Sequence, residues 1–116
     1  MKDDIIFHVV SQQLWKEKAH AGLYKPDSLE EKGFIHCSTG KQIEETANRL
    51  FKGQRKVYLL VIDVSTIEPR IVWEKPGDEE EPYPHIYGPL NTDAVLDRIT
   101  LHPNKEGYFE INVESN

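Results

Sequence analysis

The sequence predicts an α+β fold whose helices come mainly from the first half of the chain. Amphipathic segments with helix-capping residues lie before residue 53, and runs of β-branched and aromatic residues dominate after residue 57. A chain of 116 residues is long enough for one hydrophobic core and too short for two. We therefore expect residues 1–116 to form a single domain.

The first half of the chain begins with an apolar strand. Residues 5–10 are β-branched and aromatic, which predicts a strand, and Ser11 is placed to cap a helix that continues to Gly22. A brief helix is expected at residues 28–32 and a strand at residues 34–38. Ser38 or Thr39 is then expected to cap a third helix, whose buried face has helical spacing and consists of Ile43, Ala47, Leu50 and Phe51.

The second half is predicted to consist mainly of strands. Residues 57–64 are apolar at both odd and even positions, which indicates the central strand of a sheet that is covered on two sides. An acidic loop is expected at residues 78–81, and Asn91 is placed to cap a short helix that carries Val95 and Leu96. The remaining strands are expected at residues 71–73, 83–87, 99–102 and 108–113.

Composition argues against two classes of partner. The net charge of -6 opposes binding to phosphate backbones, which depends largely on lysine and arginine. No apolar run approaches the roughly 18 residues that a membrane span requires. The N-terminus lacks the pattern of a secretory signal and the single cysteine forms no internal disulfide, so we expect a cytoplasmic protein.

Three of the five histidines, His8, His36 and His85, lie in predicted strands. Side chains alternate across a strand, so His36 and Ser38 share one face while Cys37 points to the other. Cys37 is therefore expected in the core rather than as a nucleophile activated by His36. A site formed by the histidines is one interpretation; the alternative is that each imidazole only supports the core.

Two further segments carry candidate site residues. Prolines on both sides and Gly88 restrain His85 and Tyr87, as in a preorganised site or as in an edge strand that ends in a turn. Trp73 and Glu74 form an aromatic platform beside a carboxylate, although a core indole and a surface glutamate explain them equally well.

The histidine spacing matches no metal motif, so no metal is predicted. No glycine-rich phosphate loop is present in the sequence. The arginines are scattered and predict no phosphate clamp.

The order of motifs resembles the domain-of-unknown-function family 952 over nearly the whole chain. The motifs that carry this resemblance are Ile-Phe-His at residues 6–8, Gly-Phe-Ile-His-Cys-Ser at 33–38, Asn-Arg-Leu-Phe-x-Gly at 48–53, Trp-Glu at 73–74 and Pro-His-Ile-Tyr-Gly-Pro-Leu at 84–90.

A more distant resemblance is to the ADP-ribosyltransferase fold, and within it to the tRNA 2'-phosphotransferases. Residues 7–10 and 35–38 are similar to two strands that line the NAD cleft of a split β-sheet in that fold. The resemblance implies that His8 contacts a nucleotide ribose, that His36 and Ser38 flank the reacting group, and that His85 enters from a later strand. Two departures stand out: Val9-Val10 replaces a Gly-Thr pair, and the catalytic glutamate has only Glu74 as a candidate counterpart.

The sequence thus favours a domain with an ADP-ribosyltransferase-like split-sheet core and a histidine-lined cleft that binds NAD or a related nucleotide. An ADP-ribosyl- or phosphotransferase-like reaction would use His36, His85 and Glu74 as catalytic residues. His8, Ser38, Tyr87 and Trp73 would then bind the nucleotide. The alternative function is a non-catalytic module that binds a small molecule or a protein through the same residues.

Overall fold

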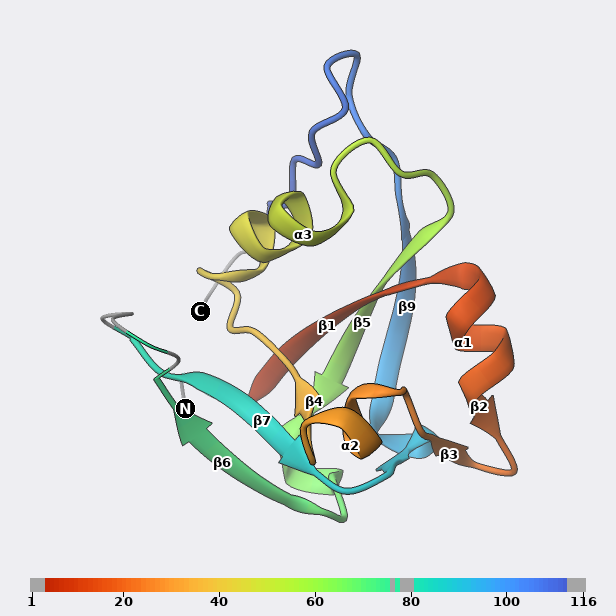
Figure 1. The fold of residues 1–116 in the computed structure, drawn as a ribbon, viewed down its shortest axis with the longest axis vertical. Coiled ribbons are helices and arrows are strands. Elements are labelled where there is room, and N and C mark those ends of the chain that lie inside the picture. The colour runs from red at the N-terminus through yellow and green to blue at the C-terminus, as the bar shows by residue number, and fades with distance from the viewer. Residues whose placement is uncertain (1–3, 76, 78–80, 113–116) are drawn as a thin grey trace.

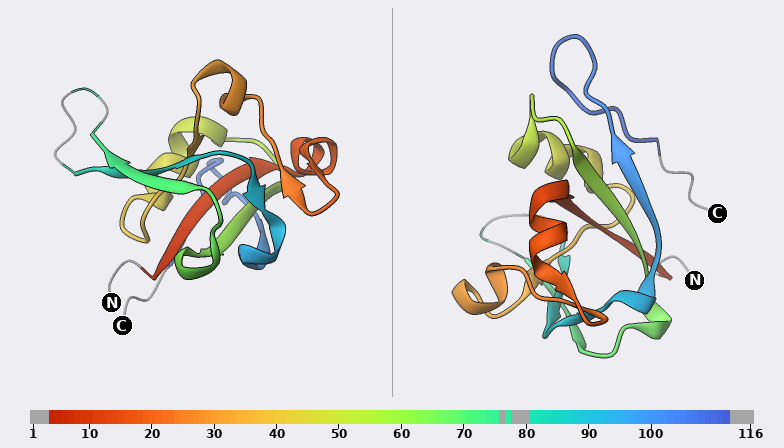
Figure 2. Two further views of the ribbon diagram at one scale, coloured as in Figure 1. Left: turned by 90° about the horizontal axis from the view of Figure 1, so that it is seen from below. Right: turned by 90° about the vertical axis from the view of Figure 1, so that its right-hand side faces the viewer.

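The computed structural model describes residues 4–75, 77 and 81–112. Their strands form three antiparallel sheets of three strands each, in the orders β1-β5-β9, β2-β3-β8 and β4-β7-β6 (Figure 1). The three α-helices all precede residue 52, and in the right-hand view of Figure 2 they lie to one side of β9. The α+β class is therefore confirmed. The bounds of the elements are β1 Ile5–Ser11, α1 Gln12–Lys18, β2 Ala19–His20, β3 Leu23–Tyr24, α2 Ser28–Glu31, β4 Ile35–His36, α3 Ile43–Phe51, β5 Val57–Asp63, β6 Arg70–Glu74, β7 Tyr83–Tyr87, β8 Leu90–Asn91 and β9 Val95–Leu101.

Strand β5 is the centre of the largest sheet, as its apolar residues of both parities predict. It pairs with β1 on one side and with β9 on the other. One face of β5 contributes Leu60 and Ile62 to a buried cluster that also contains residues of β1, β4 and β7. The other face contributes Val57 and Leu59 to a second cluster, which α3 covers.

The sheets β1-β5-β9 and β4-β7-β6 meet at one point and then diverge. Phe7 of β1 forms an isolated antiparallel bridge with Ser38, with two backbone hydrogen bonds of 2.8 Å. The predicted strand at residues 34–38 is therefore shorter than expected, because only Ile35–His36 pairs with β7 and Ser38 pairs with β1 instead. The two sheets share a boundary at the position where His8 and His36 lie.

The first helix ends earlier than predicted. Helix α1 begins after Ser11, whose hydroxyl accepts a hydrogen bond from the Leu14 N–H as expected, but it ends at Lys18. Gly22 is instead the second residue of a two-residue hairpin turn between β2 and β3, where Ala21 and Gly22 have φ angles of 54° and 82°. Such turns require positive φ at both central positions, and alanine at the first of them hides the turn from a sequence pattern.

Tertiary contacts also change how the third helix begins and which side chains it buries. The side chains of Ser38 and Thr39 do not cap α3; the Ser38 hydroxyl bonds to Thr46, and the Thr39 backbone carbonyl accepts from Ile43 N–H. Ile43 and Ala47 are buried as predicted, whereas Leu50 is 52% exposed.

Two predicted elements of the last third are wrong. Asn91 precedes a single 3-10 turn at residues 92–94, and Val95 and Leu96 begin strand β9 rather than a helix. No strand is present at residues 108–112, and Val113 lies outside the described residues. Asn48 replaces a strand partner there, because its amide accepts from Phe109 N–H and donates to Phe109 O. The predicted acidic loop also falls largely outside the described residues, at positions 78–80.

Candidate functional site

One face of the β4-β7-β6 sheet carries four of the polar side chains predicted for the site. His36 of β4 is directly opposite His85 of β7, and His85 is opposite Val72 of β6. Residues opposite each other in an antiparallel pair point to the same face, so both histidines emerge on one side, together with Glu74 and Tyr87. We call His36, His85, Glu74 and Tyr87 the histidine cluster.

A continuous chain of hydrogen bonds links the four side chains. Tyr87 OH donates to Glu74 Oε1 at 2.6 Å, and His85 Nδ1–H donates to the same oxygen at 2.7 Å. His85 Nε2 lies 3.2 Å from His36 Nδ1. When both rings are neutral, the carboxylate fixes the proton of His85 on Nδ1, so His85 Nε2 must accept the proton of His36 Nδ1.

The chain ends at an atom that has no partner. His36 Nε2 is buried and has no hydrogen-bond partner among the residues that the structure describes. In the neutral arrangement this nitrogen carries a free lone pair. A buried polar atom without a partner costs about 1–3 kcal/mol, so such an atom requires an explanation.

Electrostatics keep the buried end of the chain neutral and the exposed end charged. Burial lowers the pKa of His36 most, and together with the neighbouring His85 and His8 it brings that pKa to about 4. Hydrogen bonds from Tyr87 and then from His85 lower the pKa of Glu74, whose side chain is 40% exposed, in contrast to the 6% of His85. The hydrogen bond to Glu74 raises the pKa of Tyr87.

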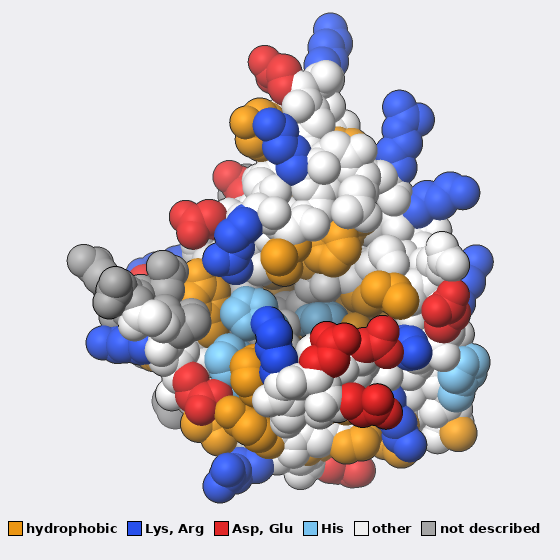
Figure 3. All heavy atoms as spheres, viewed as in Figure 1, with side chains coloured by type: hydrophobic (Ala, Val, Ile, Leu, Met, Phe, Trp, Pro, Cys, Tyr) orange, Lys and Arg blue, Asp and Glu red, His pale blue; other side chains and the backbone are white. Residues whose placement is uncertain are grey.

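Aromatic rings hold the imidazoles in place. Phe34 stacks on His85 with ring centroids 4.0 Å apart and an interplanar angle of 11°, and Tyr83 lies against His36 with centroids 5.1 Å apart. Figure 3 shows histidine side chains in a hollow on this face, with hydrophobic side chains around them. Phe34 and Tyr83 were not predicted as site residues, although both alternate with site residues along their strands.

Two cations near the site were also missed from sequence. Lys32 follows α2 and Arg49 lies in α3, and the positive charges of both contribute to the low pKa of His36. Both side chains are exposed, and neither has a hydrogen-bond or ion-pair partner in the described part of the chain. Lys32 and Arg49 lie far apart in the sequence, so no local pattern indicated that they would be near the same site.

His8 lies behind His36 and joins the two sheets. Its Nδ1–H donates to the carbonyl of His36 at 2.7 Å, so its Nε2 accepts from Tyr24 OH, also at 2.7 Å. Burial lowers the pKa of His8 to about 4. Both ring nitrogens of His8 thus have protein partners. His8 contacts the backbone carbonyl of His36 and not the His36 ring.

Among the described residues, no hydrogen bond or ring contact links the side chains of Ser38, Cys37 or Trp73 to the histidine cluster. The Ser38 hydroxyl is buried and donates to Thr46 Oγ1 at 3.2 Å rather than to His36. Cys37 is buried in the core as expected, and burial raises the pKa of its thiol. Trp73 alternates with Glu74 along β6, so its indole lies on the opposite face of the sheet.

Among the described residues, no group of three or more histidine, cysteine, aspartate or glutamate side chains is arranged to hold a metal ion.

No helix in the described residues is long and apolar enough to cross a membrane.

Comparisons with known proteins show similarity to one family model and to solved structures of a bacterial protein. Residues 9–98 match the family model described as "Protein of unknown function (DUF952)". Two crystal structures of protein CC0527 from Caulobacter crescentus, one of them of a double mutant, are 26% identical in sequence, cover 91% of this chain and 93% of theirs, and superpose with a TM-score of 0.81. A solution NMR structure of CC0527 is 28% identical, with 90% of each chain covered and a TM-score of 0.73. No curated protein matches the sequence.

Proposed function

This chain belongs to DUF952, a protein family of unknown function, and we propose that its histidine cluster binds NAD or a related nucleotide and transfers or hydrolyses one of its groups. The observation that carries the proposal is the free Nε2 of His36 at the buried end of the hydrogen-bonded chain from Glu74. A lone pair in that position is available to accept a proton from an attacking hydroxyl or water.

The hydrogen-bonded chain explains how a buried imidazole with a low pKa acts as a base. When His36 Nε2 takes up a proton, the Nδ1 proton of His36 passes to His85 Nε2. The positive charge then lies on His85, which is hydrogen-bonded to the Glu74 carboxylate. His36 becomes neutral again, so the charge is moved from a desolvated site to one with an anionic partner.

For hydrolysis of NAD, the bond between the ribose C1' atom and the nicotinamide nitrogen breaks, and the bonding electrons leave with nicotinamide. The water oxygen forms a new bond to C1', and the proton of that water goes to His36 Nε2. An acceptor hydroxyl in place of water yields ADP-ribosyl transfer with the same movement of the proton. In either reaction a proton enters at His36 Nε2 and the positive charge moves to His85, beside the Glu74 carboxylate.

Lys32 and Arg49 support an anionic substrate. Both are exposed, lack protein partners in the described residues and act electrostatically on His36. The diphosphate of a nucleotide beside the imidazoles would neutralise these two charges, and arginine is well suited to phosphate oxygens. His8 acts in this proposal as a positioning residue, because it holds the His36 carbonyl.

A second candidate function is binding without turnover, and the burial of the His36 Nε2 atom favours it. His36 Nε2 is buried, so a ligand reaches it only after neighbouring side chains move. Ser38 and His8, which the resemblance assigned to nucleotide contacts, already bond to protein groups. A module of this kind would bind the nucleotide at Lys32 and Arg49 and leave it unchanged.

The test is incubation of the protein with NAD labelled in the nicotinamide ring, with chromatography to follow nicotinamide release. We expect Glu74→Gln and His36→Gln to reduce release by a factor of about 100 or more, the range found for general acid–base groups. His20→Gln is the matched control, because His20 is exposed and lies in β2. Thermal denaturation checks that each variant is folded.

The outcomes separate the two candidates. A thermal shift with NAD that Lys32→Gln abolishes, without nicotinamide release in any variant, supports the binding module; a ligand at about 100 times its dissociation constant stabilises a protein by about 2.7 kcal/mol. If a panel of nucleotides gives neither release nor a thermal shift, both candidate functions are wrong.

A further inference from the structure

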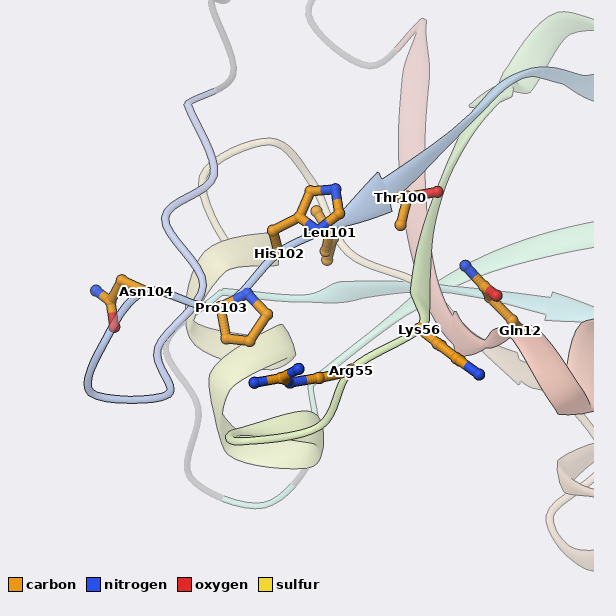
Figure 4. Close-up of a pocket in the computed structure, with 8 residues that line it drawn as sticks. All are labelled: Gln12, Arg55, Lys56, Thr100, Leu101, His102, Pro103 and Asn104. Carbon is orange, nitrogen blue, oxygen red and sulfur yellow. The ribbon is translucent and has the colours of Figure 1, made fainter.

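A cavity lies at the end of the β1-β5-β9 sheet, away from the histidine cluster. It has a volume of about 520 Å³ and is formed where α1 begins, where β5 begins and where β9 ends (Figure 4). Cavities of this size are typical of small-molecule sites. The residues that line it are Gln12, Arg55, Lys56, Thr100, Leu101, His102, Pro103 and Asn104, and we call this cavity the basic pocket.

The backbone around the basic pocket is fixed on three sides. The Gln12 N–H donates to Lys56 O at 2.8 Å, which ties the start of α1 to the start of β5. The Asn104 side chain accepts from the backbone N–H groups of Glu106 and Tyr108, and Gly53 N–H donates to Gly107 O. The loop after β9 is therefore held against the turn that follows α3, and the walls of the pocket are preorganised.

The charges in the basic pocket are uncompensated. The side chains of Arg55, Lys56 and His102 have no hydrogen-bond or ion-pair partner within the described chain, and no carboxylate is among the described residues that line the pocket. Arg55 and Lys56 are two adjacent cations in a chain whose net charge is -6. They make this pocket a local positive region on an acidic protein.

The local backbone places the two cations on either side of the pocket. Lys56 has a φ angle of 61°, in the left-handed region that lysine rarely adopts, and its carbonyl is held by Gln12. In Figure 4 the Arg55 side chain extends beside Pro103, whereas the Lys56 side chain extends beneath Gln12. The two side chains extend in opposite directions, so the guanidinium lies at the Pro103 end of the pocket and the ammonium at the Gln12 end.

We propose that the basic pocket binds a small molecule that carries a diphosphate or two separate phosphate groups. Phosphate oxygens match the planar guanidinium of Arg55 and the ammonium of Lys56, and Leu101 and Pro103 supply an apolar wall for the rest of the ligand. A nucleic acid strand fits less well, because the acidic charge of the whole chain opposes a long phosphate backbone.

The experiment is a titration followed by two-dimensional NMR of the ¹⁵N-labelled protein, with sodium pyrophosphate, orthophosphate and sulfate as probes at constant ionic strength. We expect saturable shifts of the Lys56, Thr100 and His102 amides with pyrophosphate, and weaker binding of orthophosphate and sulfate. The double variant Arg55→Gln/Lys56→Gln should weaken pyrophosphate binding by about tenfold or more. All of these side chains are exposed, so the variants are expected to fold.

The matched control is Lys25→Gln/Lys41→Gln, which removes the same charge from exposed positions outside the pocket. Unchanged affinity in this control supports the proposal, whereas an equal loss in both double variants shows that only net charge matters and overturns it. Tighter binding of a short single-stranded oligonucleotide than of pyrophosphate also overturns it. Lys32→Gln/Arg49→Gln should leave the pyrophosphate-induced shifts of the Lys56, Thr100 and His102 amides unchanged, so this result is independent of the diphosphate site proposed beside the histidine cluster.

Discussion

The ionisation of His36 and His8 depends on contacts from distant parts of the chain. His36 meets His85, which is 49 residues away, and His8 meets the backbone of His36 and the hydroxyl of Tyr24. Both imidazoles are held in the neutral form because burial lowers their pKa values to about 4. The free energy of folding therefore depends on the protonation of these two residues.

Stability should fall as the pH drops from about 6.5 to about 4. In this range the unfolded chain binds protons on His8 and His36, whose ordinary pKa is 6.5, and the folded protein excludes them. Each histidine then reduces the free energy of unfolding by up to about 1.4 kcal/mol per pH unit, with a smaller effect for the less buried His36. Urea denaturation at pH 7, 6 and 5 measures this slope.

Single-residue variants show which histidine causes the change in the free energy of unfolding with pH. His8→Gln should reduce the loss of stability between pH 7 and pH 5, and His20→Gln should leave it unchanged because His20 is exposed. A protein whose stability is constant or rises as the pH drops through this range would show that neither imidazole is kept neutral by burial.

Short elements position the candidate site. Strand β4 has only two residues, yet its pairing with β7 sets His36 opposite His85. Strand β7 in turn brings Tyr87 to Glu74 of β6. The geometry of the histidine cluster therefore depends on the register of β7 more than on the length of any strand.

Gly88, which follows β7, controls the end of that strand. It has a φ angle of 156°, and a Cβ atom there would lie 2.9 Å from Cβ of Pro69. Gly88→Ala should destabilise the protein by about 1–3 kcal/mol, because a proline ring next to the start of β6 cannot move aside as a flexible side chain does. It should also weaken the contact between Tyr87 and Glu74. Thermal denaturation and the nicotinamide-release assay measure the two effects.

Gly33→Ala is the control for the backbone contribution alone. Gly33 has a φ angle of 89°, and a Cβ atom there would meet no other atom within 4 Å, so only conformational strain of about 1 kcal/mol is expected. A smaller loss of stability for Gly88→Ala than for Gly33→Ala would mean that the contact with Pro69 does not restrain β7.

At the scale of the whole molecule, three sheets of unequal size share one core. The β1-β5-β9 sheet has strands of seven residues, and the β2-β3-β8 sheet has strands of two. The first of these sheets is covered by buried clusters on both faces. Resistance to local unfolding should differ accordingly between the sheets.

Amide hydrogen exchange should be slowest in β5 and fastest among the strands of the β2-β3-β8 sheet. The amides of β5 are hydrogen-bonded to strands on both sides, whereas β9 pairs on one side only and serves as an internal comparison of equal length. Exchange measured by NMR or mass spectrometry tests this order. Equal protection of Leu23–Tyr24 and Val57–Asp63 would contradict it.

The sequence by itself determined the fold class, the central strand and the residues from which a site could be built. These properties follow from local patterns: alternation and apolar runs define strands, and Ser11 marks the start of α1 because a cap bonds to a residue three positions later. His36, His85, Glu74 and Tyr87 were candidates on the same local grounds, and the resemblance to the domain-of-unknown-function family was also correct, with residues 9–98 matched.

Only the tertiary structure decided how those residues are connected. It linked His36 to His85 and Glu74, and it gave both nitrogens of His8 protein partners. It also buried Ser38 against Thr46. The positive charges of Lys32 and Arg49 act on His36 only in the folded chain. Trp73 lies on the other face of its sheet from Glu74. The physical reason is that strand register, burial and electrostatic neighbours arise between segments far apart in the chain, where no periodicity of the sequence records which side chains will meet.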